Sequence, residues 1–510
     1  MAYKDRVLKV EPLGTEFVPE QERHGTPRAL FGLWFSANAE IATWMVGLFT
    51  VALYGTSLKG AIAGIIIGNL IGFGLLGILS TFGPRYGIAQ MVASRLAFGW
   101  SGNALPAALS FLAGVGWFAI NTVFGAYALQ SVTGLNYFLS LVLMLALQVV
   151  LAVYGYNMIH AFERLAAFLL ASGFIVLGVF TFSKANLSAP FNSHAPFAAG
   201  GELGGFILAT ALGFSYAMGW APCASDYSRY LASRTSARQI WFYSFLGCAV
   251  PCILLQIMGA ATISAAGNID LSNASPTQAI NALLGSGVVA KIVLLTVVLG
   301  TLTSNCMNLY SGALAALVVK FPTPSLRGPL AVAALFAAVT TALLLMAHAA
   351  PLAILPTAAI TALIVGVAAR FALPRWQAAI FVGIVGALLA TGGGHPEKTA
   401  PLYTDGLLLL SYWASPWAAV VLADWTFRRR SAYRAGDAFQ ASPPIRPGTL
   451  AWLGGLAASV PFWNQAWFTG PFAAQHPQYG DLSYYVGFIV AALIMLMTRK
   501  KRPTTAEVSA

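Results

Sequence analysis

The chain has 510 residues, of which 58% are hydrophobic and only 9% are charged, whereas soluble globular chains carry about 25% charged residues. So few charges cannot cover a water-soluble protein of this size, which excludes a soluble enzyme and indicates a membrane protein. The formal net charge of +12 does not indicate nucleic-acid binding, because the Lys and Arg residues lie in short segments between apolar runs.

Apolar runs of about 20 residues, the length that crosses a bilayer, predict fourteen transmembrane helices. The fold class is therefore an all-α polytopic membrane protein, with polar tails over 1–30 and 499–510 and a transmembrane domain over 31–498. We expect poorly ordered tails and no cleavable signal peptide, because residues 1–30 lack an apolar core. The predicted spans lie at 31–55, 58–82, 104–130, 136–157, 161–183, 203–222, 239–264, 287–318, 328–347, 352–371, 376–392, 403–424, 449–467 and 483–498.

The positions of Lys and Arg favour an even number of spans. With both termini in the cytoplasm, the positive-inside rule assigns all but four of the 28 Lys and Arg residues to cytoplasmic segments. Adding or removing one span reverses this assignment from that point onward. We therefore expect a multi-pass protein of the cell (inner or plasma) membrane with both termini cytoplasmic. The four exceptions are Lys59, Lys184, Lys291 and Lys398.

The cysteines and histidines give no sign of a disulfide framework, a metal site or an enzyme centre. The four cysteines lie in or beside apolar spans at spacings typical of neither disulfides nor zinc. The six histidines lie in tails or at span ends, so they form no cluster of the kind that a membrane-embedded metalloenzyme needs. We therefore expect no catalytic residues and no cofactor.

The first span contains a carboxylic acid. Glu40 is the only carboxylate that the predicted boundaries place deep inside a span, where a charge costs about 2.5–3.5 kcal/mol on insertion scales. Burial disfavours the charged form of a carboxyl group, which is the property that a proton carrier needs near neutral pH. Glu40 is thus a candidate for carrying a proton or binding a solute. The alternative is a structural acid that stays protonated and internally hydrogen-bonded.

The third span places Trp117 and Asn121 four residues apart on one helix face. An indole with an amide one turn away can stack on a planar ring and hydrogen-bond the edge of that ring. The alternative is ordinary helix packing.

The sixth span contains helix-breaking residues. Pro222 removes a backbone donor and Gly219 loosens the chain, which predicts a break near Trp220. Broken helices near the bilayer midplane expose backbone polar groups to solutes in many transporters. Asp226 and Arg229, at the cytoplasmic end of the span, form either a surface ion pair or a gate.

The eighth span ends in a polar stretch over 301–312. Asn305 and Asn308 are one turn apart, and Thr301 lies one turn before Asn305. One interhelical hydrogen bond explains a single Asn, but not this many polar side chains in so short a stretch. We interpret the stretch as the wall of a solvated cavity.

These segments together resemble the nucleobase:cation symporter-1 family, in particular its purine–cytosine permease branch. The resemblance rests on Trp117 on the third span and on four motifs: LWFSAN at 33–38, GWxPxxSDYSRY at 219–230, NxxNLYSG at 305–312 and SYWASPWAAVVLADW at 411–425. The resemblance implies cation-coupled symport of a flat heterocycle. It also implies a five-plus-five inverted-repeat fold in which spans 1 and 6 are broken around a central site.

The resemblance implies a set of substrate contacts. They comprise an indole and an amide on the third span, an aromatic residue at the sixth-span break, an eighth-span amide and polar groups of the first span. These residues are Trp117, Asn121, Trp220, Asn305, Ser36, Asn38 and Glu40.

The chain departs from the family pattern in two respects. The family typically has twelve spans, so the resemblance implies an inserted two-span hairpin at about 320–372. Sodium-coupled relatives carry eighth-span hydroxyl groups about two turns before the substrate-binding region, but here Val298 and Leu299 occupy those positions. Thr301 or Ser304 can substitute only in a shifted register, so a proton carried by Glu40 is slightly favoured over sodium.

A membrane-embedded enzyme and a channel are the competing interpretations. The scattered histidines oppose the first, and the absence of a repeated pore motif opposes the second. The sequence leaves open which nucleobase or related heterocycle is the substrate, which cation is coupled, the stoichiometry and the oligomeric state. The expected partners are a small heterocyclic solute and the lipid bilayer, without nucleic acid.

Overall fold

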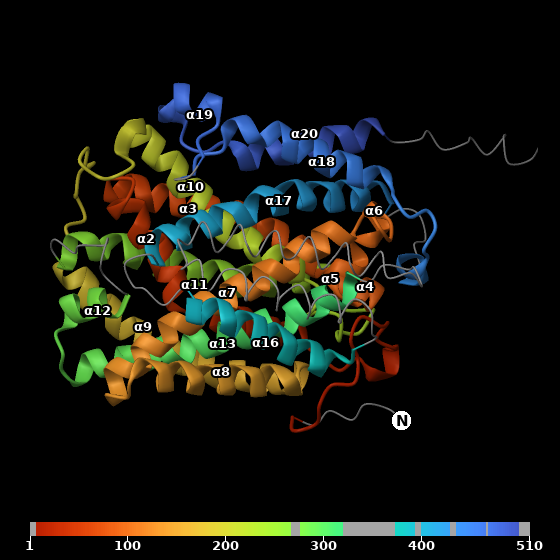
Figure 1. Ribbon diagram of the computed structural model, residues 1–510, viewed down its shortest axis with the longest axis horizontal. Coiled ribbons are helices and arrows are strands. Elements are labelled where there is room, and N and C mark those ends of the chain that lie inside the picture. The colour runs from red at the N-terminus through yellow and green to blue at the C-terminus, as the bar shows by residue number, and fades with distance from the viewer. Residues whose placement is uncertain are drawn as a thin grey trace, which may run out of the picture.

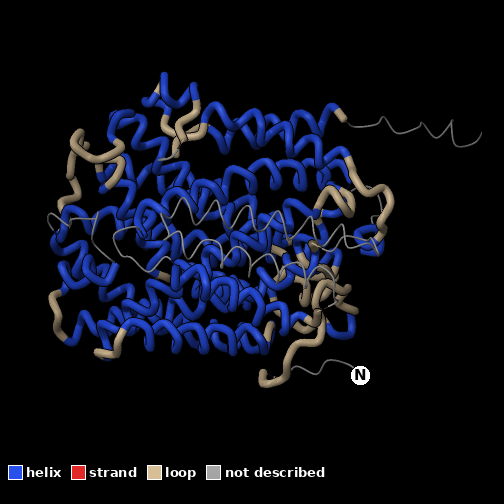
Figure 2. The backbone as a smooth tube through the Cα atoms, viewed as in Figure 1, coloured by secondary structure: helices blue, strands red, loops and turns tan. Residues whose placement is uncertain are grey.

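The computed structural model describes residues 7–266, 276–319, 373–392, 399–428, 435–465 and 468–498. Over these ranges the regular structure is helical, and long helices are joined by short loops (Figure 2). The predicted hairpin at 320–372, with its spans at 328–347 and 352–371, lies outside the described residues.

Every other predicted span falls on a helix or a pair of helices. Among the described residues, seven helices are long and apolar enough to cross a membrane by length and composition. The long helices after the first span are α3 (Leu58–Ser80), α7 (Ala104–Thr133), α8 (Tyr137–Tyr154), α9 (Tyr156–Lys184), α10 (Gly201–Trp220), α11 (Ala237–Ala266), α13 (Val288–Val318), α16 (Arg375–Gly392), α17 (Thr399–Arg428), α18 (Pro447–Ser459) and α20 (Ser483–Met497).

The first predicted span is two helices. Helix α1 (Pro27–Asn38) and helix α2 (Ile41–Ala52) are separated by Ala39 and Glu40, of which Glu40 has extended backbone. A break leaves backbone carbonyls without helical partners, and side chains supply donors to them here. The Thr43 hydroxyl donates to the Asn38 carbonyl at 2.7 Å, and the Asn38 amide donates to the Trp34 carbonyl at 2.8 Å.

The sixth span ends as its sequence predicts. Helix α10 stops at Trp220, and a short 3-10 turn, η3 (Ala221–Cys223), contains Pro222. The chain then continues in turns as far as Tyr230. The predicted break near Trp220 is therefore confirmed, and it lies beside the break in the first span.

The helices form two packed groups with the broken segments between them. Helices α2 and α3 pack with α11, which also covers α1, and α10 packs against α3 and α2. Helices α7, α8, α13 and α16 pack against one another, and α9 contacts α13, α1 and α11. Figure 1 shows α7, α13, α16 and α8 in one half of the molecule and α17, α18 and α20 along its opposite edge. The first-span break therefore lies where one group meets the other.

The segment at 7–26, called the N-terminal segment below, is not the loose tail that the sequence predicts. Its residues Glu11 and Val18 are 1% and 0% exposed. Its backbone amides reach the ends of the bundle helices: Glu11 donates to the Tyr154 carbonyl at 3.0 Å and Val18 to the Gly87 carbonyl at 2.8 Å. The segment lies at the end of the bundle where α20 also ends (Figure 1).

Glycine lets α2 and α11 cross closely. A Cβ atom on Gly259 of α11 would lie 1.9 Å from the Trp44 carbonyl oxygen, and one on Gly47 of α2 would lie 1.7 Å from the Gln256 carbonyl oxygen. Real Cβ atoms do not approach backbone this closely, so the two helices require glycine at both positions.

We predict that Gly259→Ala lowers the stability of the detergent-purified protein by about 1–3 kcal/mol, because the added methyl group overpacks a backbone contact. Thermal unfolding of the purified protein measures this. Gly32→Ala in α1 is the matched control, since a Cβ at Gly32 meets no atom within 4 Å. Equal unfolding temperatures for the two variants would contradict the close crossing.

Candidate functional site

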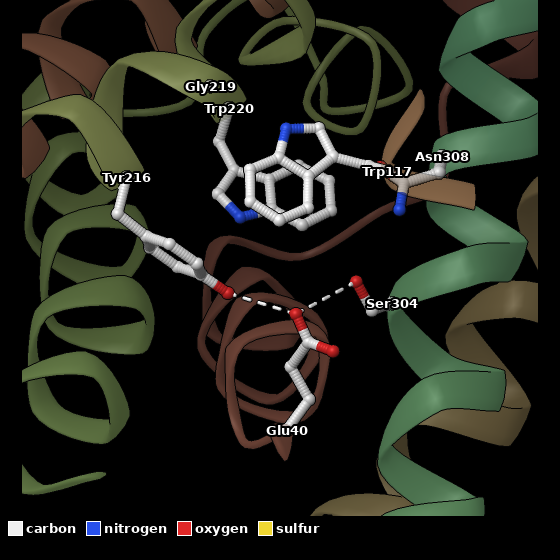
Figure 3. A pocket seen from close by; sticks show the side chains of 7 residues that line it. All are labelled: Glu40, Trp117, Tyr216, Gly219, Trp220, Ser304 and Asn308. Atoms are coloured by element: carbon white, nitrogen blue, oxygen red, sulfur yellow. Dashed lines mark hydrogen bonds between the residues drawn. The ribbon is translucent and has the colours of Figure 1, made fainter. Parts of the chain in front are cut away.

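A small cavity lies between the first-span break and helices α7, α10 and α13 (Figure 3). The space between its lining atoms is about 260 Å³ when the part open to solvent is included, and the centre of a water molecule can reach only about 20 Å³ of it. The lining side chains thus nearly fill the cavity in this arrangement, and a solute larger than water needs them to move apart. Its lining residues are Glu40, Trp117, Tyr216, Gly219, Trp220, Ser304 and Asn308.

Glu40 is the only acidic residue among those that line this cavity. Its side chain is 1% exposed and projects from the gap between α1 and α2 (Figure 3). One carboxyl oxygen, Oε1, accepts hydrogen bonds from the Tyr216 hydroxyl at 3.0 Å and the Ser304 hydroxyl at 3.4 Å. The other oxygen, Oε2, is buried and has no hydrogen-bond partner among the described residues. Glu40 therefore has one oxygen fixed by the protein and one available.

Asn121 reaches the same carboxyl group through Ser304. Its amide nitrogen donates to the Ser304 hydroxyl at 3.2 Å, and that hydroxyl donates onward to Glu40. Within the described part of the chain, the Asn121 carbonyl oxygen Oδ1 is buried without a partner. The sequence-predicted pair Trp117 and Asn121 is thus brought to one site, with Trp117 lining the cavity and Asn121 behind Ser304.

Aromatic rings form the remaining walls of the cavity. The Trp117 and Tyr216 rings meet edge to face with centroids 6.0 Å apart, and Trp220 packs edge to face on Trp34 at 5.7 Å. Gly219 keeps the space beside Trp117 open, because a Cβ there would lie 3.7 Å from the indole nitrogen. Such faces suit a flat, polarisable ring.

The amide that lines the cavity from α13 is Asn308 rather than the predicted Asn305. Asn305 faces α7, where it donates to the Phe118 carbonyl at 3.0 Å and the Thr122 hydroxyl at 3.1 Å. It accepts a hydrogen bond from Asn308 at 3.1 Å, so it orients the amide that reaches the cavity. The spacing of Ser304 and Asn308, four residues apart on one helix face, would have identified this face of α13.

Three other predicted site residues point elsewhere. The Ser36 hydroxyl donates to the Gly32 carbonyl at 2.7 Å and to the Glu163 carbonyl at 3.0 Å. The Asn38 side chain bonds within α1 and accepts from the Cys252 thiol at 3.3 Å. The Thr301 hydroxyl donates to a carbonyl of its own helix, at Val298, 2.9 Å away. These groups shape the surroundings of the cavity without lining it.

A residue that the sequence analysis did not select, Thr303, joins the break to α13. Its hydroxyl donates to the Ser36 carbonyl at 2.9 Å. Tyr216 was also missed, although it lies four residues before Trp220 on the same face of α10, a spacing that marks a shared face.

Asp226 and Arg229 are both buried, at 3% and 0% exposed, so the surface ion-pair interpretation is wrong. Asp226 accepts from the Gln90 backbone amide at 2.8 Å. Arg229 instead forms an ion pair with Glu11 of the N-terminal segment at 2.9 Å. Arg375 of α16 approaches the other carboxyl oxygen of Glu11 at 3.4 Å.

Two tyrosines complete this group, which we call the Glu11 cluster: Glu11, Arg229, Arg375, Tyr230 and Tyr310. Both tyrosine hydroxyls donate to Glu11 Oε1, that of Tyr310 at 3.0 Å. Arg229 also donates to the Gly14 carbonyl and to the Tyr310 hydroxyl. The cluster thus ties the N-terminal segment to the sixth-span break, the end of α13 and the start of α16.

The fold is that of a polytopic, all-helical transporter. Among solved structures, the chain is similar to a nucleobase-cation-symport-1 family transporter in a closed conformation with bromovinylhydantoin bound, with a TM-score of 0.66 and 19% identity over 96% of this chain and 95% of that chain. It is also similar to a substrate-bound, outward-open Na⁺-coupled sialic acid symporter, with a TM-score of 0.55 and 12% identity over 93% and 90%.

Sequence relatives narrow this class to a family. Residues 17–373 match the family described as permease for cytosine/purines, uracil, thiamine, allantoin. The chain is 28% identical to a putative purine-cytosine permease of Bacillus subtilis (strain 168) over 97% of both chains. It is 26% identical to a purine-cytosine permease of Emericella nidulans over 96% of this chain and 89% of that one. The chain belongs to the nucleobase:cation symporter-1 family and is a membrane transporter rather than an enzyme.

We predict that Glu11→Ala destabilises the protein by about 3–5 kcal/mol, because it leaves two buried arginine side chains without their carboxylate. Thermal unfolding in detergent provides the measurement. Glu20→Ala is the control from the same segment: its ion pair with Arg23 spans 3.3 Å, but the Glu20 side chain is 49% exposed, so the loss is at most about 1 kcal/mol. A Glu11→Ala protein as stable as the control would refute the importance of the buried cluster.

Proposed function

We propose that this chain is a secondary transporter that couples a cation gradient to uptake of a purine or pyrimidine nucleobase, such as cytosine or adenine. The observation that carries the proposal is that Glu40 Oε2, which has no hydrogen-bond partner among the described residues, lies in one cavity with Trp117 and Trp220, while Asn121 lies behind Ser304. Supporting it, the two relatives described above are named purine-cytosine permeases.

The chemistry of the site matches such a solute. A nucleobase is flat and apolar on its faces, so it stacks on Trp117 and Trp220. Its edge carries ring and amino N–H donors next to acceptors, which Glu40 and the amides of Asn121 and Asn308 can satisfy. Removing these partners leaves buried polar groups unpaired, so the same contacts also discriminate among bases.

A proton is the preferred coupling cation, with sodium as the alternative. Glu40 is a buried carboxyl group inside the span, and a carboxyl can bind and release a proton. The hydroxyls predicted for sodium each donate a hydrogen bond within the protein, Thr301 to its own helix and Ser304 to Glu40.

The charge distribution supports a cytoplasmic N-terminal segment, because nearly all Lys and Arg residues fall on that side of the predicted spans. The Glu11 cluster then acts as the cytoplasmic gate in the conformation described here. Of the two residues predicted to form a gate, Arg229 forms the ion pair with Glu11. Asp226 instead accepts a hydrogen bond from the backbone amide at the start of α5 (Gln90–Ala93).

A related flat heterocycle is the alternative substrate class. A vitamin B6 transporter of Saccharomyces cerevisiae is 24% identical over 61% of this chain, and a hydantoin permease of Microbacterium maritypicum is 29% identical over 39%. Allantoin, hydantoins and pyrimidine vitamins share the flat ring and the polar edge that the cavity suits.

The test is uptake of labelled cytosine, adenine, hypoxanthine, uracil and allantoin into proteoliposomes, with a proton gradient compared against a sodium gradient. Gradient-driven accumulation of one of these solutes establishes symport and identifies the cation. Failure of all five under both gradients would refute the nucleobase proposal.

We predict that Trp117→Ala, Asn121→Ala and Asn308→Ala each abolish uptake, because they remove the stacking face or the edge contacts while the protein stays folded. Uptake of the identified solute into proteoliposomes, with equal amounts of reconstituted protein, measures this. Trp376→Ala is a control, because Trp376 is 38% exposed on α16 and lies outside the cavity. Wild-type uptake by any of the three variants would remove that residue from the site.

A further inference from the structure

A second carboxyl group lies deep in the helix bundle, and the sequence analysis missed it. Glu163 lies two turns inside α9, whose first residue is Tyr156, five residues before the predicted start of the span. The Glu163 side chain is 0% exposed. Its oxygen Oε1 accepts a hydrogen bond from the Cys306 thiol at 3.3 Å, and its oxygen Oε2 is buried without a partner among the described residues.

No cation compensates this carboxyl group. Across the described residues, the ion pairs join Glu11 and Glu20 to arginines and none involves Glu163. Transfer of an unpaired carboxylate from water to such a site is strongly unfavourable, so the group is neutral in this closed arrangement. A Gln or a Leu side chain at position 163 would fill the same space without binding a proton.

The surroundings contain few other groups that titrate. Helix α13 contributes Cys306, which contacts the carboxyl group of Glu163. Helix α8 contributes Tyr137 and Tyr154 at its two ends, and α12 (Pro276–Leu284) contributes no titratable side chain. The remaining titratable or charged side chains on α9 and on the helices packed against it are Tyr156, His160, Arg164 and Lys184 on α9, Arg28 on α1, Arg238, Tyr243, Cys248 and Cys252 on α11, and Lys291 and Tyr310 on α13.

Glu163 lies on the boundary between the two packed groups of helices. The Ser36 hydroxyl of α1 donates to the Glu163 backbone carbonyl at 3.0 Å, and Thr303 of α13 donates to the Ser36 carbonyl at 2.9 Å. The carboxyl therefore faces the place where α1, α9 and α13 meet, beside the first-span break. Separation of α1 from α13 would admit water to this point.

Glu163 is also distinct from Glu40. Glu40 contacts Ser304 and Glu163 contacts Cys306, two residues further along α13, and residues two apart point to different helix faces. Glu40 lines the cavity, where a bound solute occupies its free oxygen. Glu163 does not line the cavity, so its proton can be exchanged while the solute is held.

We propose that Glu163 is a second proton-binding site of the transporter. Its carboxyl O–H is intact when α1 and α13 close on it; when they separate, the O–H bond breaks, the proton passes to water and the carboxylate stays hydrated. Proton binding thereby favours closure. The proposal rests on the transport function given above, but not on the identity of the base.

The test is Glu163→Gln in the full chain, reconstituted in proteoliposomes. Gln keeps the size and the acceptor for Cys306 but cannot release a proton. With a pH difference of about one unit, one coupled proton drives about tenfold accumulation. E163Q is expected to lose the share of accumulation that the Glu163 proton drives, a roughly tenfold lower ratio than wild type at this pH difference, while still exchanging labelled for unlabelled solute at equal pH. The proposal is overturned if E163Q accumulates the solute to the same ratio as the wild-type protein. It is also overturned if accumulation by the wild-type protein responds to a sodium gradient alone.

Two controls separate this proposal from the proposed function. Glu202→Gln removes a carboxylate that is exposed at the start of α10 and should leave both exchange and accumulation unchanged. Glu40→Gln alters the cavity and should impair exchange as well as accumulation. If the wild-type protein neither exchanges nor accumulates any base, the substrate assignment fails, and the infrared measurement below still tests Glu163.

Infrared spectroscopy detects a protonated carboxyl group without any solute. The difference spectrum of wild type minus E163Q should contain a carboxylic acid carbonyl band that disappears as pH is raised. A difference spectrum without this band, or one whose band persists through alkaline pH, overturns the proposal. Should E163Q not fold, Cys306→Ala replaces it: loss of the thiol donor should shift the band, and an unshifted band overturns the assignment.

Discussion

The interruption of the first span at Ala39 and Glu40 is the constraint on which the site depends. An intact helix would hold the Glu40 side chain against neighbouring turns, whereas the extended backbone at Glu40 turns the carboxyl into the cavity. Helix α13 can approach the break because Gly300 lacks a side chain: a Cβ there would lie 2.9 Å from the Ala39 carbonyl oxygen. Close approach in turn brings Ser304 and Thr303 within hydrogen-bond range of the first span.

Polar residues near the break divide into two kinds with different physical roles. Backbone groups freed by a break inside a bilayer have no water to bond, so side chains must satisfy them. Asn38, Thr43 and Thr303 serve that purpose, because each donates to a backbone carbonyl of α1. Glu40 Oε2 and Asn121 Oδ1, by contrast, accept no hydrogen bond from the part of the chain that the structure describes, so these two oxygens do not serve to satisfy the break.

The sequence predicted the helices well, because a 20-residue apolar run has one stable form in a bilayer. It also predicted the break at Trp220, since proline and glycine act locally. It did not separate Asn305 from Asn308, because both lie in one polar stretch and only the packing of α13 against α7 decides which of them faces the cavity. Local patterns likewise carry no information on contacts between distant segments.

Glu11 and Glu163 show that limit most clearly. Glu11 belongs to a polar segment before the first span, and its burial depends on two arginines more than 200 residues away in the chain. Glu163 lies near the start of an apolar run, two residues inside the predicted boundary of the span. A carboxyl group so close to a span boundary is expected to contact the lipid headgroups. The helix begins at Tyr156, earlier than hydropathy indicates, and this places the carboxyl about two turns inside the helix.

The cavity and the Glu11 cluster are connected by the same two stretches of chain. Residues 220–230 run from Trp220 in the cavity to Arg229 and Tyr230 in the cluster, and α13 carries Asn308 in the cavity and Tyr310 in the cluster. Tyr227 holds the stretches together, since its hydroxyl donates to the Met307 carbonyl at 2.9 Å. A displacement of Trp220 or Asn308 would therefore be transmitted to Arg229 and Tyr310 of the cluster, which connects the cavity mechanically to the end of the bundle where the N-terminal segment lies.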